Sequence, residues 1–217
     1  GKEYYDNGKL KYEGEYLNEK KNGKGKEYNN EGKLIFEGEY LNGGKTGKGK
    51  EYYDNGKLKF EGEYLNGFRN RKGKEYYDGK LIFEGRFLNG ERNEKGKEYY
   101  DNGKLKFEGE YLNGKRKKGK EYYDNGNLKF EGNFFSGERN GEGKEYYDNG
   151  ILKFEGEYLN GGKTGKGKEY YDNGIIKFEG EYLNGKRKKG KEYYDNGILK
   201  FEGEYLNEKK NEKCHIF

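Results

Sequence analysis

The sequence repeats itself every 23 or 24 residues, and this periodicity limits the fold more than any other feature. The triplet aromatic-Glu-Gly occurs nine times, first at Tyr12 and last at Phe201. A second marker, Gly-Lys-Glu-Tyr, also occurs nine times, beginning at Gly1. No linker separates the copies, so we expect one array of nine repeats over residues 1–211, followed by a tail at 212–217.

Glycine is too frequent for long helices. The chain carries 40 glycines, and no stretch between two of them reaches the ~12 residues that an isolated helix needs. Only 29% of the residues are hydrophobic, which is too few to fill a two-layer core. Aromatic residues, at 18%, are nevertheless far more frequent than in disordered chains. We therefore expect an ordered, thin, all-β fold.

The tripeptide Asp-Asn-Gly lies between two aromatic-rich runs in most repeats, which predicts a β-hairpin there. One repeat has only Asp78-Gly79 at this turn. This deletion fits a three-residue loop in the other repeats, with Gly8 and its equivalents in the left-handed conformation. The resulting register pairs Tyr5 with Lys9, Tyr4 with Leu10, and Glu3 with Lys11.

Side chains alternate between the two faces of a strand, so this register divides each repeat into two faces. Face one holds Tyr4, Leu10, Tyr12, Gly14 and Tyr16. Face two holds Glu3, Tyr5, Lys9, Lys11, Glu13, Glu15 and Leu17. Because face one varies less among the nine copies, we expect it to be packed and face two to be solvated. The Gly14 position is always glycine, which indicates that a ring from an adjacent strand lies over the backbone.

The expected architecture is an all-β, single-layer, twisted antiparallel meander of about nine hairpins. A polar, glycine-rich loop connects each hairpin to the next. Each repeat would contact only its neighbours, so stability should build up along the array as in other repeat proteins.

The repeat resembles the MORN (membrane occupation and recognition nexus) repeat. The shared pattern is seen here as Phe36-Glu-Gly-Glu-Tyr40, Asn42-Gly43 and Gly47-Lys48-Gly49. The segment 52–58 is similar to the MORN variant of many bacterial proteins, some of them labelled antitoxins. The resemblance covers residues 1–211, although tryptophan is absent and Gly-x-Gly is complete only at Gly23, Gly47, Gly141 and Gly165. It implies a scaffold, dimer or membrane-associated role more often than any chemistry.

Motifs that usually carry catalysis or cofactor binding are incomplete. Gly44-Lys45-Thr46 imitates the end of a phosphate-binding loop, but Glu39 stands where that loop requires glycine. The only histidine, His215, has no acid nearby in the repeat pattern, which argues against triads and histidine metal sites. Rows of Glu13 equivalents are better explained as cross-strand partners of lysines such as Lys9 than as catalytic pairs. We expect no enzyme activity, no cofactor and no metal site.

Two of the predicted loops are strongly basic. They contain Lys115, Arg116, Lys117 and Lys118, and Lys186, Arg187, Lys188 and Lys189. These residues are either solvated charges that aid solubility or a basic edge that contacts an acidic partner or anionic lipid headgroups. Nucleic acid is not expected, because the net charge is only +5 and glutamate rows lie behind the loops.

The tail contains the only cysteine, Cys214, four residues from the end and followed by His215-Ile216-Phe217. This arrangement fits a prenylation box, and a terminal phenylalanine suggests a geranylgeranyl group. The alternative is an incidental terminal cysteine. A lone thiol suits a reducing compartment, so we expect a cytoplasmic protein, with lipidation placing it at the cytosolic face of a membrane.

The last three repeats have isoleucine where the first five have lysine after the Asp-Asn-Gly turn. The register places these isoleucines beside tyrosines on face two, which predicts an apolar partner or dimer face. Its residues are Ile151, Ile175, Ile198, Tyr147, Tyr171 and Tyr194. Cover by the chain's own tail is the alternative.

The leading hypothesis is a non-enzymatic scaffold that binds a protein partner, another copy or anionic phospholipid. One alternative is a binding protein that sequesters a partner, as an antitoxin does. Another is an accessory repeat region of a larger enzyme.

Overall fold

The computed structural model describes residues 1–206 and 209–211, and these ranges contain nineteen strands and no helix. The described part of the chain therefore offers no helix that could cross a membrane. The chain forms two compact units. Unit 1 comprises residues 1–105 and 111–114, and unit 2 comprises 106–110 and the described residues from 115 onward.

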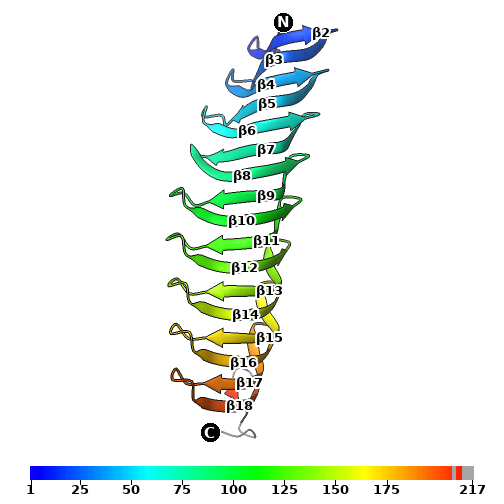
Figure 1. The fold of residues 1–217 in the computed structure, drawn as a ribbon. Helices are drawn as coiled ribbons and strands as arrows, with labels where there is room; N and C mark the ends of the chain where they lie inside the picture. Colours follow the sequence, from blue (N-terminus) through cyan, green and yellow to red (C-terminus); the bar gives the residue numbers. More distant parts are fainter. Residues whose placement is uncertain (207–208, 212–217) are drawn as a thin grey trace. The chain divides into compact units, whose positions relative to one another are not determined.

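Consecutive strands pair antiparallel within each unit, which confirms the predicted all-β meander (Figure 1). Unit 1 contains β1 (Lys2–Tyr4), β2 (Leu10–Leu17), β3 (Lys20–Tyr28), β4 (Leu34–Leu41), β5 (Gly44–Tyr52), β6 (Leu58–Leu65), β7 (Phe68–Tyr77), β8 (Lys80–Leu88) and β9 (Glu91–Tyr99). The residues of β10 (Leu105–Leu112) are divided between the units. Unit 2 contains β11 (Lys115–Tyr122), β12 (Leu128–Phe135), β13 (Glu138–Tyr146), β14 (Leu152–Leu159), β15 (Gly162–Tyr170), β16 (Ile176–Leu183), β17 (Lys186–Tyr193), β18 (Leu199–Leu206) and β19 (Lys209–Lys210).

The Asp-Asn-Gly turns have the predicted three-residue geometry. The Tyr5 N–H donates to the Lys9 carbonyl at 2.9 Å, and the Gly8 N–H donates to the Tyr5 carbonyl at 2.9 Å. Gly8 has φ +78°, the left-handed conformation that glycine adopts without strain. Tyr4 lies opposite Leu10, so the first two pairs of the predicted register are confirmed.

The third predicted pair is wrong, because a β-bulge follows Leu10. Glu3 lies opposite Tyr12, and Lys11 is the extra residue of the bulge. One inserted residue exchanges the faces of the partner strand. The Glu3 position therefore joins the aromatic rings, and the Tyr16 hydroxyl donates to Glu3 at 2.6 Å.

The first tyrosine of each repeat moves to the other face for the same reason. The Tyr28 hydroxyl donates to Glu13 at 2.7 Å, whereas the predicted register places these two positions on opposite faces of the sheet. The same bulge recurs between Glu145 and Tyr146 and in the other hairpins with this turn. The sequence could not reveal it, since apolar and polar residues still alternate at Leu10, Lys11 and Tyr12, although Leu10 and Tyr12 lie opposite consecutive residues of β1.

The predicted polar loops are mostly strand. After Leu41, the chain reverses through a two-residue turn, with Asn42 at φ +50° and Gly43 at φ +90°. These values fit the type I′ turn favoured by Asn-Gly. Strand β5 then begins at once, and the extra residues Gly47 and Lys48 form an irregularity inside the ladder rather than a loop.

One aromatic ring per repeat is fully buried, and these rings form the core. They are Tyr12, Phe36, Phe60, Phe83, Phe107, Phe130, Phe154, Phe178 and Phe201. The Phe154 ring makes edge-to-face contacts with Tyr158 of its own strand and with Tyr182 two strands away, each at 5.3 Å between centroids. Residues i and i+4 of a straight strand lie ~13 Å apart. The strand therefore bends toward the rings at the glycine between them.

That glycine accepts no larger side chain. A Cβ atom on Gly38 would lie 2.7 Å from the Phe36 ring and 2.8 Å from the Cα of Gly49. The covering ring belongs to the same strand, which corrects the expectation of a ring from an adjacent strand. At Gly49, the cross-strand partner of Gly38, the ring does come from the adjacent strand.

We expect Gly109→Ala to destabilise the protein by about 3 kcal/mol or more, because its methyl group would overlap the Lys118 carbonyl oxygen. Gly150→Asn should cost only about 1 kcal/mol, since nothing lies within 4 Å and asparagine tolerates φ +84°. Urea unfolding of both variants measures the difference. Equal losses would contradict the packing described for the glycine pairs.

Candidate functional site

A groove of ≈ 970 Å³ runs across the strands of unit 2. Its lining consists of seven glycines, seven lysines and seven glutamates. The glycines form the floor, where each one lies opposite another glycine on the neighbouring strand. They are Gly119, Gly132, Gly143, Gly156, Gly167, Gly180 and Gly190. The aromatic rings cover the same row from the opposite face, so the core and the groove share one row of glycines.

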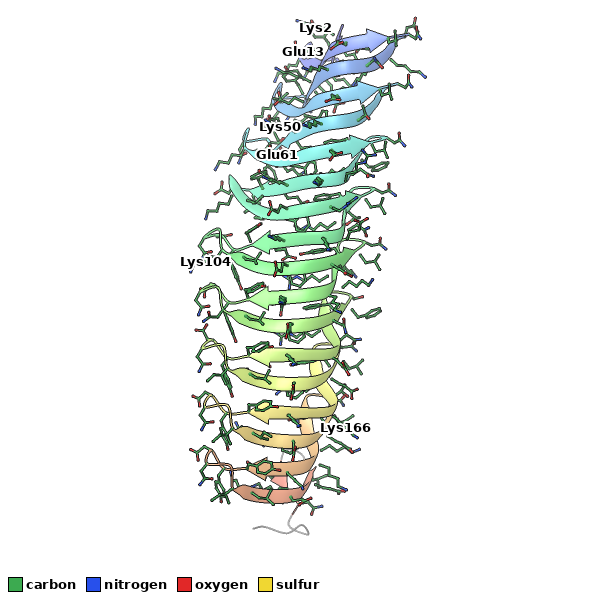
Figure 2. The ribbon with its side chains drawn as sticks, in the orientation of Figure 1. Lys2, Glu13, Lys50, Glu61, Lys104 and Lys166 are labelled. Atoms are coloured by element: carbon green, nitrogen blue, oxygen red, sulfur yellow. The ribbon has the colours of Figure 1, made fainter. Side chains whose placement is uncertain are left out.

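One wall of the groove alternates in charge from strand to strand. Its residues are Lys120, Glu131, Lys144, Glu155, Lys168, Glu179, Lys191 and Glu202. Each lies directly opposite the next across the ladder, so the sign changes every ~4.8 Å. Figure 2 labels an equivalent pair of unit 1, Lys50 of β5 and Glu61 of β6. The predicted pairing of Glu13 with Lys9 is wrong, because Glu13 lies opposite Lys2 and Lys26.

Tyrosine hydroxyls hold the carboxylates of this wall in place. Tyr146 donates to Glu131 at 2.8 Å, and Tyr170 donates to Glu155 at 2.6 Å. Burial and the hydrogen bond to Glu131 raise the pKa of Tyr146 to about 12. The hydroxyl therefore remains a donor at neutral pH, and the glutamates are oriented before any partner arrives.

The opposite wall is less regular. It contains Lys118, Glu142, Glu157, Lys166, Glu181 and Lys189. Glu181 lies opposite both Lys166 and Lys189, whereas Glu142 and Glu157 form a like-charged pair. The lining as a whole carries equal numbers of lysines and glutamates, so the groove attracts neither a purely anionic nor a purely cationic ligand.

The predicted basic edge is distributed over two strands, β11 and β17. Lys118 and Lys189 line the groove. Arg116 and Arg187 point to the other face, where their guanidinium carbons lie 4.3 Å and 4.6 Å from the ring centroids of Phe107 and Phe178. The remaining members of the basic edge are exposed; they are Lys115, Lys117, Lys186 and Lys188.

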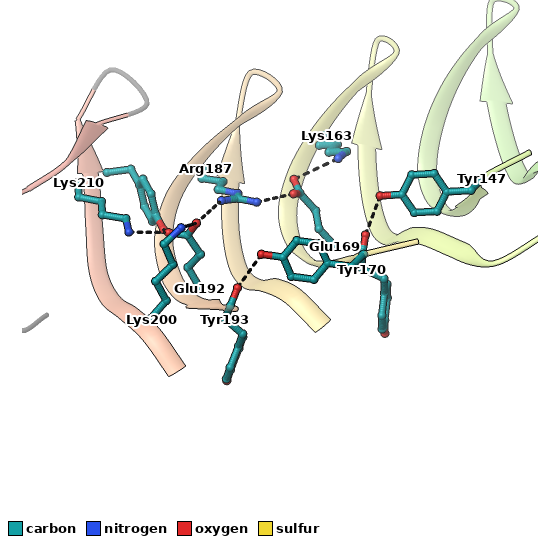
Figure 3. A network of polar contacts seen from close by, with 11 residues as sticks. Tyr147, Lys163, Glu169, Tyr170, Arg187, Glu192, Tyr193, Lys200 and Lys210 are labelled. Atoms are coloured by element: carbon teal, nitrogen blue, oxygen red, sulfur yellow. Dashed lines mark hydrogen bonds and ion pairs between the residues drawn. The ribbon is translucent and has the colours of Figure 1, made fainter. Parts of the chain in front are cut away.

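Behind the floor, lysines, arginines and glutamates form an interior row that we call the ion ladder. Its members in unit 1 are Glu3, Lys21, Glu27, Lys45, Glu51, Arg69, Glu75, Arg92 and Glu98. Its members in unit 2 are Arg116, Glu121, Arg139, Glu145, Lys163, Glu169, Arg187, Glu192 and Lys210. Figure 3 shows the last five members of unit 2.

Each cation of the ion ladder covers an aromatic ring and pairs with carboxylates. The Lys163 ammonium lies 4.4 Å from the Phe154 ring centroid and 3.2 Å from Glu169. Arg187 contacts Glu169 at 2.6 Å and Glu192 at 3.8 Å. Burial alone raises the pKa of Glu169, but Arg187 and Lys163 outweigh it and hold that pKa below its usual range.

Sequence reasoning missed the ion ladder, although a signal was present. The second residue after each two-residue repeat-connecting turn is a cation in all nine copies, from Lys21 to Lys210. The sequence pattern places these cations in polar loops, and its two-residue period places the glutamates of the Glu3 position on the solvated face. The bulge and the two-residue turn together bring both rows onto the aromatic face.

The predicted apolar face is less exposed than expected. Ile151 and Ile175 are half-buried, and the hydroxyl of Tyr147 donates to the carbonyl of Tyr170 in the next repeat at 2.8 Å. Ile198 is 62% exposed, and Tyr194 is 45% exposed. The tyrosines at this face therefore join neighbouring repeats, in addition to any role toward a partner.

Cys214 and the rest of the proposed prenylation box lie outside the described residues. Among the described residues, no group of three or more histidines, cysteines or acidic residues could hold a metal ion.

Models of known protein families match most of the chain. The family model described as the MORN repeat variant matches residues 1–18, 21–42, 45–66, 95–113, 117–135, 139–160, 163–184 and 188–207. The model described as the MORN repeat matches residues 60–80. No curated protein gives a significant match.

We expect the protein to lose stability on acidification below about pH 4.3, the pKa of an unperturbed glutamate. Glu27, Glu51, Glu169 and Glu192 all have folded-state pKa values below their usual range. A carboxyl group whose pKa is lower in the folded state stabilises the fold at pH values above its unfolded-state pKa. This contribution is lost as the pH falls through the folded-state pKa. Urea unfolding between pH 7 and pH 3 measures this loss.

A matched variant, Glu169→Gln, should be less stable at neutral pH and should lose less stability on acidification. A free energy of unfolding that stays constant from pH 5 to pH 3 in the unmodified protein would contradict the ion ladder as a source of stability.

Proposed function

Because the chain belongs to the MORN repeat family, we propose that it is a non-enzymatic scaffold that binds a protein segment in the groove of unit 2. The observation that carries this proposal is the wall of alternating lysines and glutamates. Its carboxylates are held by tyrosine hydroxyls in an open groove.

The wall suits a polypeptide that carries both charges. Preformed side-chain positions reduce the entropy lost on binding, and complementary charges add specificity. Salt bridges between the wall residues themselves are weak in the free protein: the Lys144–Glu155 distance is 3.8 Å, and so is that between Lys191 and Glu202. Both charges therefore remain available to a partner.

Association with anionic membranes is a second candidate. Exposed lysines on β11 and β17 support it, at ~1 kcal/mol for each basic residue near such a surface. Prenylation at Cys214 would add a second membrane signal. Vesicle flotation with anionic and neutral lipids, before and after Lys115, Lys117, Lys186 and Lys188 are replaced by glutamate, tests this candidate separately from the groove, whose lining does not include these four residues.

A homodimer through the C-terminal repeats is part of the same proposal. The exposed side chains of Tyr194 and Ile198 support it, and the half-buried Ile151 and Ile175 extend the surface less than the sequence suggested.

Selection from a random peptide library tests binding in the groove. We expect enriched peptides to carry both lysine and glutamate. The variant Lys144→Glu/Lys168→Glu/Lys191→Glu should weaken their binding at least tenfold in fluorescence anisotropy, because it makes the wall acidic at every position from Glu131 to Glu202.

The matched control changes the equivalent lysines of unit 1, Lys26, Lys50 and Lys74, to glutamate. It alters the net charge equally and should change the dissociation constant less than twofold. The proposal is wrong if no peptide is enriched, or if both variants weaken binding equally.

A further inference from the structure

Strand β8 carries an arginine where the preceding even-numbered strands of unit 1 carry a glutamate. Arg86 directly follows Gly85, the glycine that packs against the buried ring of this strand. The equivalent residues of β2, β4 and β6 are Glu15, Glu39 and Glu63. In unit 2, Glu157 takes this position and lines the less regular wall of the groove. Arg86 therefore lies on the face of unit 1 that corresponds to the groove, and its side chain is exposed.

The exchange creates a pair of like charges, because Arg86 lies directly opposite Lys72 of β7. In the two preceding hairpins the equivalent pairs carry opposite charges; they are Lys24–Glu39 and Lys48–Glu63. Like charges directly opposite each other destabilise an antiparallel pair. A departure from a local rule that the neighbouring hairpins follow, at a cost in stability, is typical of a functional position.

The glutamate at this position can accept a hydrogen bond from the backbone of the next strand. This contact is present from Lys24 to Glu15 at 3.0 Å, from Lys48 to Glu39 at 3.4 Å, and from Lys166 to Glu157 at 3.4 Å. Each donor N–H follows a glycine whose φ lies between +54° and +70°, and N–H groups beside a left-handed residue form concave anion sites. These repeats therefore bind an anion here, which is a carboxylate of the chain itself.

Lys95 of β9 is the equivalent donor beside Arg86. The residue before it, Glu94, has φ +55°, so the backbone has the same left-handed conformation as at Gly47, where φ is +54°. A guanidinium group donates hydrogen bonds and accepts none, so Arg86 offers no acceptor to the Lys95 N–H. Arg86, Lys72 and the Lys95 N–H thus border a position where the equivalent repeats place a negative charge.

One carboxylate of the chain contacts Arg86. The Nε atom of Arg86 lies 2.8 Å from Glu94, and the two side chains are 51% and 58% exposed. Exposed ion pairs are weak, so a competing anion can displace Glu94. The contact also uses only Nε, one of the three guanidinium nitrogens that can donate.

We propose that Arg86, Lys72 and the Lys95 N–H bind a phosphate group on a polypeptide, that is, a phosphorylated serine, threonine or tyrosine. A phosphate monoester carries a charge of about −1.5 to −2 and three acceptor oxygens. It therefore neutralises both facing cations and still accepts the backbone hydrogen bond, whereas a carboxylate would neutralise only one of them. Arginine binds phosphate through two parallel hydrogen bonds, which lysine cannot provide.

The surrounding charges favour one phosphate on a polypeptide over a phospholipid surface. Glu63 of β6 and Glu84 of β8 lie on the same face as Arg86, because each is next to a glycine that faces the rings. A continuous anionic surface would bring further phosphates against these glutamates. A polypeptide can place a single phosphate at Arg86 and neutral or basic residues beside it. This inference does not rest on the groove of unit 2.

Amide chemical shifts of the full chain, measured during a titration with phenyl phosphate, test the site. We expect the Lys95 resonance to shift in a saturable way and the Lys48 resonance to stay unchanged, because Glu39 already accepts from Lys48. The variant Arg86→Glu/Glu94→Gly rebuilds the combination found at Glu39 and Gly47. It should abolish the shift of Lys95 without lowering the melting temperature.

The converse variant, Glu39→Arg/Gly47→Glu, transfers the site to β4 and β5. Lys24 lies opposite residue 39 as Lys72 lies opposite Arg86, so the transfer keeps the facing cation. We expect the Lys48 resonance of this variant to respond to phenyl phosphate. Equal responses of Lys48 and Lys95 in the unmodified protein, or no response of Lys95, would overturn the proposal.

Peptide libraries with a fixed phosphoserine, phosphothreonine or phosphotyrosine identify the source of the phosphate. We expect selected peptides to bind at least tenfold more tightly than their unphosphorylated forms in fluorescence anisotropy, and to lose this preference in Arg86→Glu/Glu94→Gly. A response to phenyl phosphate without phosphopeptide binding would show an adventitious ion only and overturn the proposal. Arg86-dependent binding of vesicles that contain phosphatidic acid, without phosphopeptide binding, would assign the site to membranes. Binding in the groove of unit 2 is measured with different variants, so its failure is distinguishable from failure here.

Discussion

The packing of one aromatic ring over a pair of glycines is the constraint on which the rest of the structure depends. The ring bends its own strand, brings a second ring into edge-to-face contact, and leaves no room for a Cβ on either glycine. The backbone of the same glycines forms the floor of the groove on the opposite face, between two walls of charged residues. The core and the groove therefore share one row of glycines.

The ion ladder explains how so polar a chain keeps its rings buried. Only 29% of the residues are hydrophobic, and in the part of the chain that the structure describes no second layer of strands or helices covers the rings. The aliphatic stems and charged heads of lysine and arginine cover them instead, as Arg69 does at 4.3 Å from the Phe60 ring centroid. A buried cation without a partner would be costly, and Arg69 is neutralised by Glu75 of its own strand and by Glu51 two strands away.

The sequence predicted the architecture well, because repeat length, turn residues and the invariant glycine each report a local geometry. The positions of Tyr12 and Gly14 on the packed face follow from strict alternation, and the turn at Gly8 follows from its composition. The bulge at Lys11 has no such signature, since it arises from how two strands twist against each other. Because of that single residue, the sequence did not reveal the interior position of Glu3 or the hydrogen bond from Tyr28 to Glu13. The groove was also not predicted from the sequence. Glycine, lysine and glutamate are typical of loops and solvated surfaces, and only the pairing of the strands brings them together into one groove.

A double-mutant cycle between Gly143 and Phe130 tests the central contact most directly. A Cβ on Gly143 would lie 2.5 Å from Cζ and 2.6 Å from Cε2 of the Phe130 ring, with the nearest backbone atom at 3.3 Å. If the ring is what excludes the methyl group, Gly143→Ala should be much less costly in a Phe130→Leu background. The account predicts a coupling free energy of about 1 kcal/mol or more in urea unfolding. Losses that add to within about 0.5 kcal/mol would contradict it.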